Sequence, residues 1–300
     1  MSIVVTGATG ALGSSIIKHL HAFNQEQEKP KKIIGTSRDL RKVSDDLKAL
    51  TGVEFRYADF DDDSAILEEA FVGAEKVLII STDVFDNEKR IVQHKNAIDA
   101  VKRAGVGIVY YTSSYYGGFE SKSVSEVQQL HLETEEYIKR SGINYVILRE
   151  GIYAESFPIM LNWTPDTTRV VVPADGPLSW ISREELAEAN ARILLSNSKE
   201  YRNTIALLTG SSTLTLRQIA ELITEVTGKP LSFEVSEEAY VLAALKAGQN
   251  EKIVKTFVTI YKALEAGEGD IVDPLSEVLL GRKPIGAREK IREILEKGRK

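Results

Sequence analysis

Short apolar runs alternate with longer stretches in which apolar residues recur every three or four positions. Six such runs stand at 2–7, 31–38, 53–60, 76–82, 107–114 and 144–151. Runs of this length favour buried strands, and the periodic stretches between them favour amphipathic helices. Strands that alternate with helices predict a parallel sheet covered by helices on both faces. We therefore expect an α/β fold, a Rossmann-type doubly wound parallel sheet, over residues 1–150.

The pattern changes after Gly151. Strand-like runs at 168–174 and 204–210 enclose a helical stretch at 182–195, and mostly helical periodicity continues after 211. Thr215 and Gln218 have the spacing of a capping box at the start of a helix. We expect two regions: a dinucleotide-binding domain at 1–150, completed by parts of 175–210, and a smaller, helix-rich substrate-side region at 151–300.

Composition narrows the function classes. The 300 residues are 43% hydrophobic and 27% charged, with net charge −6 and no cysteine. Absent cysteines exclude disulfides, thiolate catalysis and zinc–thiolate sites, and no metal site is expected. No stretch has the roughly 18 apolar residues of a membrane helix, and no secretory signal is visible, so the default location is cytoplasmic. Without a long basic stripe, binding to nucleic acid is not expected.

A glycine-rich loop follows the first predicted strand. Gly7, Gly10 and Gly13 recur every three residues between that strand and a helical stretch. Glycines here allow a tight turn, close backbone approach to a phosphate, and close packing of the helix on the strand. The free N–H groups of the following helix suit a pyrophosphate. The alternative is a plain tight turn.

The end of the second strand indicates which dinucleotide is bound. An enzyme that uses NAD has an acidic residue there, whereas this chain has Ser37 and Arg38. An arginine suits a 2′-phosphate because its planar fork binds two oxygens, so NADPH is the expected cofactor. Asp39 is expected to cap the next helix. Asp59, after the third strand, is placed either to meet the adenine or to cap a helix.

Several short motifs occur in one order: "TGATGALG", "SR", "ADF", "LIIST", "YTSS" and "ILREGIYAESF". In this order the chain resembles the NmrA-like branch of the atypical short-chain dehydrogenases, and within it the NADPH:quinone oxidoreductases and triphenylmethane reductases. The resemblance runs from the first strand to about residue 230. Relatives usually read "RNG" where this chain reads "REG", so Glu150 leaves the substrate open.

The resemblance implies a set of ligand-binding residues. The segment Glu150–Ser156 would border the nicotinamide, with Tyr153 reaching toward the substrate, and Arg183 would lie near the cofactor. The residues expected to bind the cofactor are Gly7, Thr9, Gly10, Ala11, Leu12, Gly13, Ser37, Arg38, Asp59, Phe60, Ile80, Ser81, Thr82, Thr112, Ser113, Gly151, Tyr153, Ala154 and Glu155.

The Tyr-x-x-x-Lys pair of ordinary short-chain dehydrogenases is absent from the helix after the fifth strand. Tyr137 is followed four residues later by Ser141, and matching the helix to the family places Val127 and His131 at the two positions. His131 and Tyr153 are the catalytic candidates. For His131, chemistry, positioning of a ligand, and hydrogen-bonded packing all stay open.

Aromatic residues follow the strands at the carboxyl edge, where such folds bind ligands. Tyr115, Tyr116, Phe157 and Trp163 would form a wall for a flat acceptor, or belong to the core. The expected function is hydride transfer from NADPH to a quinone or similar conjugated aromatic. The alternative is a non-catalytic NADP(H) sensor that regulates a protein partner. A homodimer is also left open.

Overall fold

The computed structural model describes residues 2–84, 86–197 and 199–298 and divides the chain into two compact units. The first unit is Met1–Ser113, Leu130–Arg149 and Glu184–Ala206. The second unit is Ser114–Gln129, Glu150–Arg183 and Leu207–Lys300.

A seven-stranded sheet forms the centre of the first unit, in the order β10-β6-β5-β4-β1-β2-β3. Its strands are β1 (Ser2–Val5), β2 (Lys32–Ser37), β3 (Val53–Tyr57), β4 (Ala74–Ile79), β5 (Ile108–Ser114), β6 (Asn144–Glu150) and β10 (Thr204–Leu208). The pairs β1–β2, β2–β3, β1–β4 and β4–β5 are parallel. The order reverses at β1, as in doubly wound folds, which confirms the predicted fold class.

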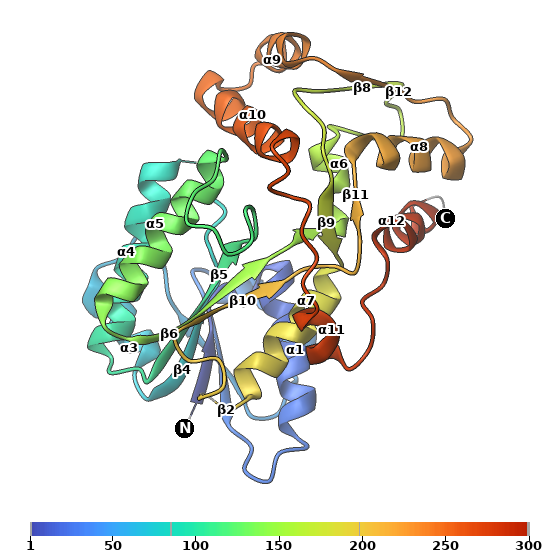
Figure 1. Ribbon diagram of the computed structural model, residues 1–300. Coiled ribbons are helices and arrows are strands. Elements are labelled where there is room, and N and C mark those ends of the chain that lie inside the picture. The colour runs from blue at the N-terminus through green and yellow to red at the C-terminus, as the bar shows by residue number, and fades with distance from the viewer. Residues whose placement is uncertain (1, 85, 198, 299–300) are drawn as a thin grey trace. The chain divides into compact units, whose positions relative to one another are not determined.

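Helices cover both faces of this sheet (Figure 1). They are α1 (Ala11–Asn24), α2 (Asp45–Lys48), α3 (Ser64–Phe71), α4 (Asn87–Arg103), α5 (Glu126–Ser141) and α7 (Arg183–Leu195), with a short 3-10 turn η1 (Leu40–Lys42). Apolar residues of α3, α4 and α5 pack on one face with sheet residues such as Val77 and Val109. On the other face, Ser15 and His19 of α1 both bond Glu184 of α7.

The second unit contains two small sheets and most of the C-terminal helices. Its strands are β7 (Ile152–Tyr153), β8 (Arg169–Val172), β9 (Leu178–Ile181), β11 (Thr213–Leu214) and β12 (Ser232–Val235). Its helices are η2 (Ala154–Ser156), α6 (Phe157–Met160), α8 (Leu216–Thr227), α9 (Glu237–Lys246), α10 (Glu251–Glu265), α11 (Leu275–Leu280) and α12 (Ala287–Lys297). Thr215 and Gln218 form the predicted capping box of α8. A separate apolar core, which includes the fully buried Trp180, packs most of these elements together.

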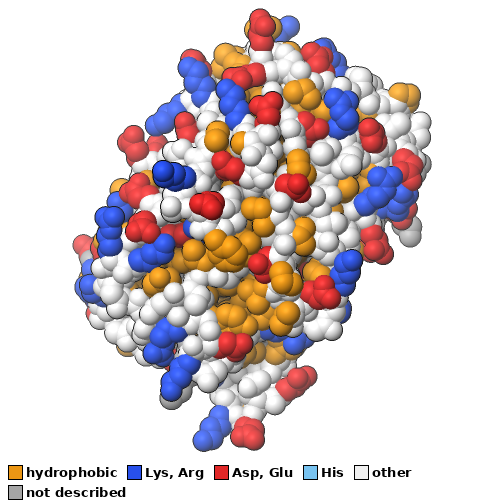
Figure 2. All heavy atoms as spheres, in the orientation of Figure 1, with side chains coloured by type: hydrophobic (Ala, Val, Ile, Leu, Met, Phe, Trp, Pro, Cys, Tyr) orange, Lys and Arg blue, Asp and Glu red, His pale blue; other side chains and the backbone are white. Residues whose placement is uncertain are grey.

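Charged residues of both signs are interspersed over the face drawn in Figure 2. That distribution agrees with the absence of a long basic stripe in the sequence. No helix among the described residues is long and apolar enough to cross a membrane.

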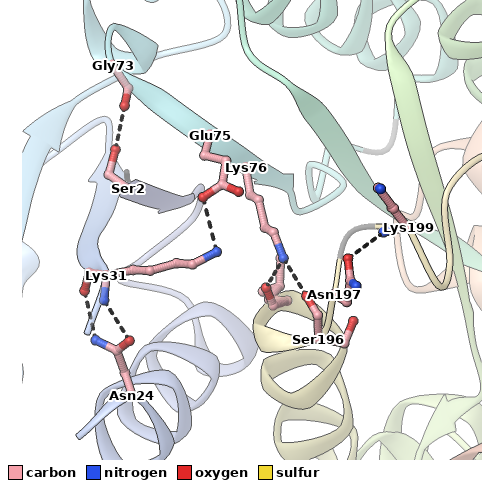
Figure 3. Close-up of polar contacts among 10 residues, drawn as sticks. Ser2, Asn24, Lys31, Gly73, Glu75, Lys76, Ser196, Asn197 and Lys199 are labelled. Carbon is pink, nitrogen blue, oxygen red and sulfur yellow. Dashed lines mark hydrogen bonds and ion pairs between the residues drawn. The ribbon is translucent and has the colours of Figure 1, made fainter. Parts of the chain in front are cut away.

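A buried lysine joins β4 to the end of α7 in the first unit. Lys76 is 1% exposed, and its Nζ donates to the carbonyls of Leu194 at 2.7 Å and Ser196 at 2.9 Å (Figure 3). The carbonyls at the end of a helix lack intrahelical partners and favour a cation. Burial lowers the pKa of Lys76 to about 8.

We expect the stability contributed by Lys76 to rise with pH. Between about pH 8 and 10 the unfolded lysine binds more protons than the folded one, so the free energy of unfolding increases, by up to about 2 kcal/mol. Lys76→Met lacks this titration. Urea unfolding of both proteins at pH 8, 9 and 10 measures the difference. A constant difference across this range would show that Lys76 titrates normally in the fold.

Candidate nucleotide-binding site

The glycine loop turns directly from β1 into α1. Gly7 has φ +64°, a conformation that side chains rarely adopt, and its carbonyl accepts from Gly10 N at 2.9 Å. A Cβ on Gly13 would lie 2.3 Å from the carbonyl oxygen of Gly7. Gly13 therefore allows the first turn of α1 to pack against the loop, as the sequence predicts.

The first turn of α1 presents its N–H groups without a capping side chain. Gly10 is the N-cap residue and has an extended backbone, and no acidic residue stands in the first turn. Ala11, Leu12 and Gly13 therefore keep backbone donors at the positive end of a 14-residue helix. Such an end binds phosphate oxygens.

Two hydroxyls connect the loop to the end of β2. Thr9 Oγ1 lies 3.0 Å from Ser37 Oγ, and Ser37 also contacts the backbone of Asp39. Asp39 caps η1, as predicted, and holds Arg41 through two bonds of 2.9 and 3.0 Å. Arg38 is exposed and takes part in none of the ion pairs found among the described residues. Of these two arginines, Arg38 is the one whose guanidinium stays available for an anion.

The next predicted positions follow β3 and β4. Asp59 accepts from Asp61 N in a local turn, and Asp63 is the N-cap of α3, so the capping alternative for Asp59 is wrong. Phe60 is buried in the core of the first unit. Ile80, Ser81 and Thr82 continue β4 to the same edge as the glycine loop, where Thr6 Oγ1 accepts from Ile80 N.

His131 is 5% exposed, and both its ring nitrogens are bonded. Nε2 lies 3.2 Å from Arg90 Nη2, and Nδ1 lies 2.8 Å from the hydroxyl of Tyr111. A guanidinium only donates, so Nε2 accepts and the ring proton sits on Nδ1. Burial, reinforced by Arg90, lowers the pKa of His131 well below its ordinary value. A neutral His131 in this network can position Arg90 but has no acidic proton to deliver.

His94 and the end of β4 complete this network. Thr82 N donates to His94 Nε2 at 3.2 Å, and His94 Nδ1 lies 3.1 Å from Thr134 Oγ1. Burial lowers the pKa of His94 to about 3, and burial raises the pKa of Tyr111 to about 12. Three titratable rings thus stay neutral together at physiological pH.

Thr112 and Ser113 use their hydroxyls inside the first unit. Thr112 Oγ1 accepts from Ser81 N, and Ser113 Oγ donates to Glu135 at 2.6 Å. Glu135 in turn accepts two bonds from Arg149, at 2.9 and 2.7 Å, and both charged side chains are 1% exposed. A buried pair with two parallel bonds fixes the end of β6 against α5.

Four of the predicted residues lie in the second unit, around β7. Arg183 Cζ stands 5.0 Å from the ring centre of Tyr153, whose hydroxyl donates to Glu150 at 3.4 Å. Glu155 accepts from Arg183 N, and Ala154 is buried. A Cβ on Gly151 would lie 3.2 Å from the carbonyl of Ser179. Burial and Glu150 raise the pKa of Tyr153, so its phenol stays protonated and is not activated as a base.

Three of the four aromatic wall candidates belong to the core of the second unit. Tyr115, Tyr116 and Phe157 are at most 3% exposed, and the hydroxyl of Tyr115 donates to Gly269 O and accepts from Ser179 N. Their positions agree with the core alternative that the sequence left open. Trp163 is half-buried, with its ring centre 5.8 Å from that of Phe157.

Two hollows each lie within one of the two units. One of about 600 Å³ lies at the amino ends of β2 and β3, beside Lys32 and Val53, which is the sheet edge opposite the glycine loop. The other, about 310 Å³, is mainly apolar and lies in the second unit, where its lining includes Phe157, Trp163, Ile223 and Ile294. Within the described residues, no cluster of three His, Asp or Glu suits a metal ion.

Arg90, Glu135 and Arg149 were missed as candidates. Arg90 stands in the polar stretch "NEKR", which is typical of an exposed helix end. The sequence did offer a sign of the pair Arg149 and Glu135. Arg149 stands at the end of an apolar strand and Glu135 on an apolar helix face, and charged residues in such places are rarely buried unless they are paired.

A glycine loop after β1, an uncapped helix N-terminus and a strand order that reverses at β1 define a Rossmann-type nucleotide-binding fold. The sequence profile of the NmrA-like family matches residues 1–278, so the chain belongs to the NmrA-like family. This confirms the resemblance seen in the sequence.

Two relatives and one solved structure illustrate the similarity. An NmrA-like family domain-containing oxidoreductase of Aspergillus flavus is 34% identical over 305 residues, which cover 100% of this chain and 96% of the relative. Quinone oxidoreductase 2 of Escherichia coli is 32% identical, and the match covers 82% of this chain and 81% of that protein. Triphenylmethane reductase from Citrobacter sp., crystallised with NADP(H), superposes with TM-score 0.82 at 30% identity, over 98% and 99% of the two chains. The relatives are oxidoreductases.

Replacing Gly13 by alanine should destabilise the fold more than replacing Gly10 by alanine. Gly13→Ala places a Cβ against the carbonyl of Gly7 and should lower the free energy of unfolding by about 1–3 kcal/mol. Gly10→Ala, with its nearest contact at 3.3 Å and a β-region backbone, should cost less than about 1 kcal/mol. Urea unfolding measures both. Equal losses would show that the close approach is not what requires Gly13.

Proposed function

We propose that the protein is an NADPH-dependent reductase that transfers hydride to a quinone or a similar conjugated aromatic acceptor. The observation that carries the cofactor assignment is the uncapped N-terminus of α1 beside Arg38. The first supplies N–H donors for a pyrophosphate, and the second supplies a guanidinium for a 2′-phosphate. Relatives named for quinone and triphenylmethane reduction support the acceptor class.

In this proposal Gly7, Gly10 and Gly13 let the backbone approach the pyrophosphate, and Thr9 with Ser37 holds the loop beside Arg38. When bound, NADPH supplies the hydride. The residues of the chain bind and orient it. Gly151, Tyr153, Ala154 and Glu155 are proposed to border the nicotinamide.

The acid–base groups favour acceptors that need no proton during hydride transfer. His131 is neutral with both nitrogens bonded, and Tyr153 has a raised pKa and no lysine four residues on. Simple ketones require a proton donor as the hydride arrives. Quinones hold the new charge on oxygen and take their proton from water afterwards.

Arg38→Ala should separate the two cofactors. A charge-assisted hydrogen bond contributes roughly 1.5–3 kcal/mol, so NADPH affinity should fall about 10- to 100-fold while NADH affinity is unchanged. Arg41→Ala is the matched control, and should change NADPH affinity by less than about threefold because its exposed pair with Asp39 contributes little. Fluorescence titration of both nucleotides gives the constants. Equal losses for NADPH and NADH would show that Arg38 does not bind the 2′-phosphate.

The reductase assignment predicts a ranking of acceptors. At fixed NADPH, 1,4-naphthoquinone and a triarylmethane dye should be reduced, and an aliphatic ketone of similar size should be reduced at least about 100-fold more slowly, the range that general acid catalysis supplies. Steady-state loss of NADPH absorbance measures all three. NADPH binding without turnover of any acceptor would instead favour the nucleotide sensor.

A further inference from the structure

Arg90 is a partly buried cation without an anionic partner. It extends from the first turn of α4, one turn after the N-cap Asp86, to the end of β4. Its Nη2 donates to Ser81 Oγ at 2.6 Å and to His131 Nε2 at 3.2 Å. None of the ion pairs in the described part of the chain involves Arg90. Its Nε and the nearby Thr82 Oγ1 are buried and, among the described residues, have no hydrogen-bond partner.

The groups around this guanidinium do not compensate its charge. His131, His94 and Tyr111 are neutral for the reasons given above. Asp83 is exposed and reaches Arg90 only through space. A charge in such a place costs several kcal/mol unless an anion or several acceptors meet it. Arg149, which has Glu135, shows how this unit neutralises a cation that serves the fold alone.

The location of Arg90 indicates a ligand. Ser81 and Thr82 follow β4 at the carboxyl edge of the parallel sheet, the edge at which doubly wound folds bind ligands. When the helix is matched in sequence to the family pattern, His131 takes the position that a lysine has in ordinary short-chain dehydrogenases. With a neutral histidine there, the cation next to that position is Arg90.

We propose that Arg90 binds the negatively charged oxygen of the reduced acceptor, and that His131 and Ser81 position its guanidinium. This assignment rests on the proposed function. Hydride transfer moves two electrons and one proton from NADPH to the quinone, giving NADP⁺ and a hydroquinone monoanion. The monoanion then takes one proton from water. Arg90 stabilises the monoanion because a guanidinium in a water-poor site interacts strongly with developing charge.

Binding of a stable anion tests this without turnover. The probe is 2-hydroxy-1,4-naphthoquinone, which is ionised at neutral pH, and the neutral reference is 2-methoxy-1,4-naphthoquinone. Both are titrated into the protein saturated with NADP⁺. Arg90→Met should weaken the ionised probe about 10- to 100-fold and the neutral probe less than about threefold. Equal losses for the two probes, or no loss, would overturn the proposal.

Matched variants separate the effect of the charge of Arg90 from the effect of the position in which His131 holds it. Arg103→Met, on the last turn of the same helix, removes an exposed arginine that pairs with Glu68 and should change neither affinity. His131→Leu removes the acceptor that holds Arg90 and should weaken the ionised probe selectively. His131→Asn keeps an acceptor and should restore at least part of that affinity. Failure of this rescue, with both variants folded by circular dichroism, would reject the positioning role.

A measurement on the wild-type protein covers the case in which Arg90→Met does not fold. Spectrophotometric titration of the bound probe gives the pKa of its hydroxyl, which should fall on binding if a cation faces the ionised oxygen. A raised pKa, or no binding of either probe, would overturn the assignment. If the anion binds through Arg90 while no quinone is reduced, the anion site stands and the reductase function fails.

Discussion

The site depends first on how closely the backbone of α1 approaches the loop after β1. The carbonyl of Gly7 occupies the space where a side chain of residue 13 would stand, with only 2.3 Å to an added Cβ. This packing aims the first turn of α1 at the carboxyl edge of the sheet. Because Gly10 carries no side chain, the N–H groups of that turn stay available. One steric constraint therefore produces both the local fold and the free N–H groups that we propose bind the pyrophosphate.

Arg149, Lys76 and Arg90, three cationic side chains of the first unit, have three different kinds of partner. Arg149 has a carboxylate with two parallel hydrogen bonds, and Lys76 has two carbonyls at a helix end. Among the described residues, the hydrogen-bond partners of Arg90 are a hydroxyl and a neutral imidazole. Fold stability explains the partners of Arg149 and Lys76, because these partners neutralise or solvate a charge whose burial would otherwise be costly. Arg90 differs from both, because the described part of the fold gives its charge no comparable compensation.

The periodicity of the sequence was sufficient to predict the parallel sheet, the glycine loop and the capping box of α8, because each is decided within a few neighbouring residues. Tyr115 shows where such reasoning stops: its place in the core depends on Gly269 and Ser179, far away in the chain. The same holds for Arg90, whose partner His131 is 41 residues away. The local sequence around Arg90 is typical of an exposed helix end. The packing of α4 on β4 is what partly buries its side chain.

The neutral histidines bear on what kind of chemistry this edge of the sheet can support. The guanidinium of Arg90 and the N–H of Thr82 each donate to an Nε2 nitrogen, which fixes the remaining ring protons on Nδ1. Protonation of either ring would require breaking one of these bonds while placing a second charge beside Arg90. The network therefore opposes proton delivery by histidine and leaves a fixed positive charge in its place. A fixed charge stabilises an oxyanion without itself changing protonation state, which is the requirement of an acceptor that receives hydride first and its proton later.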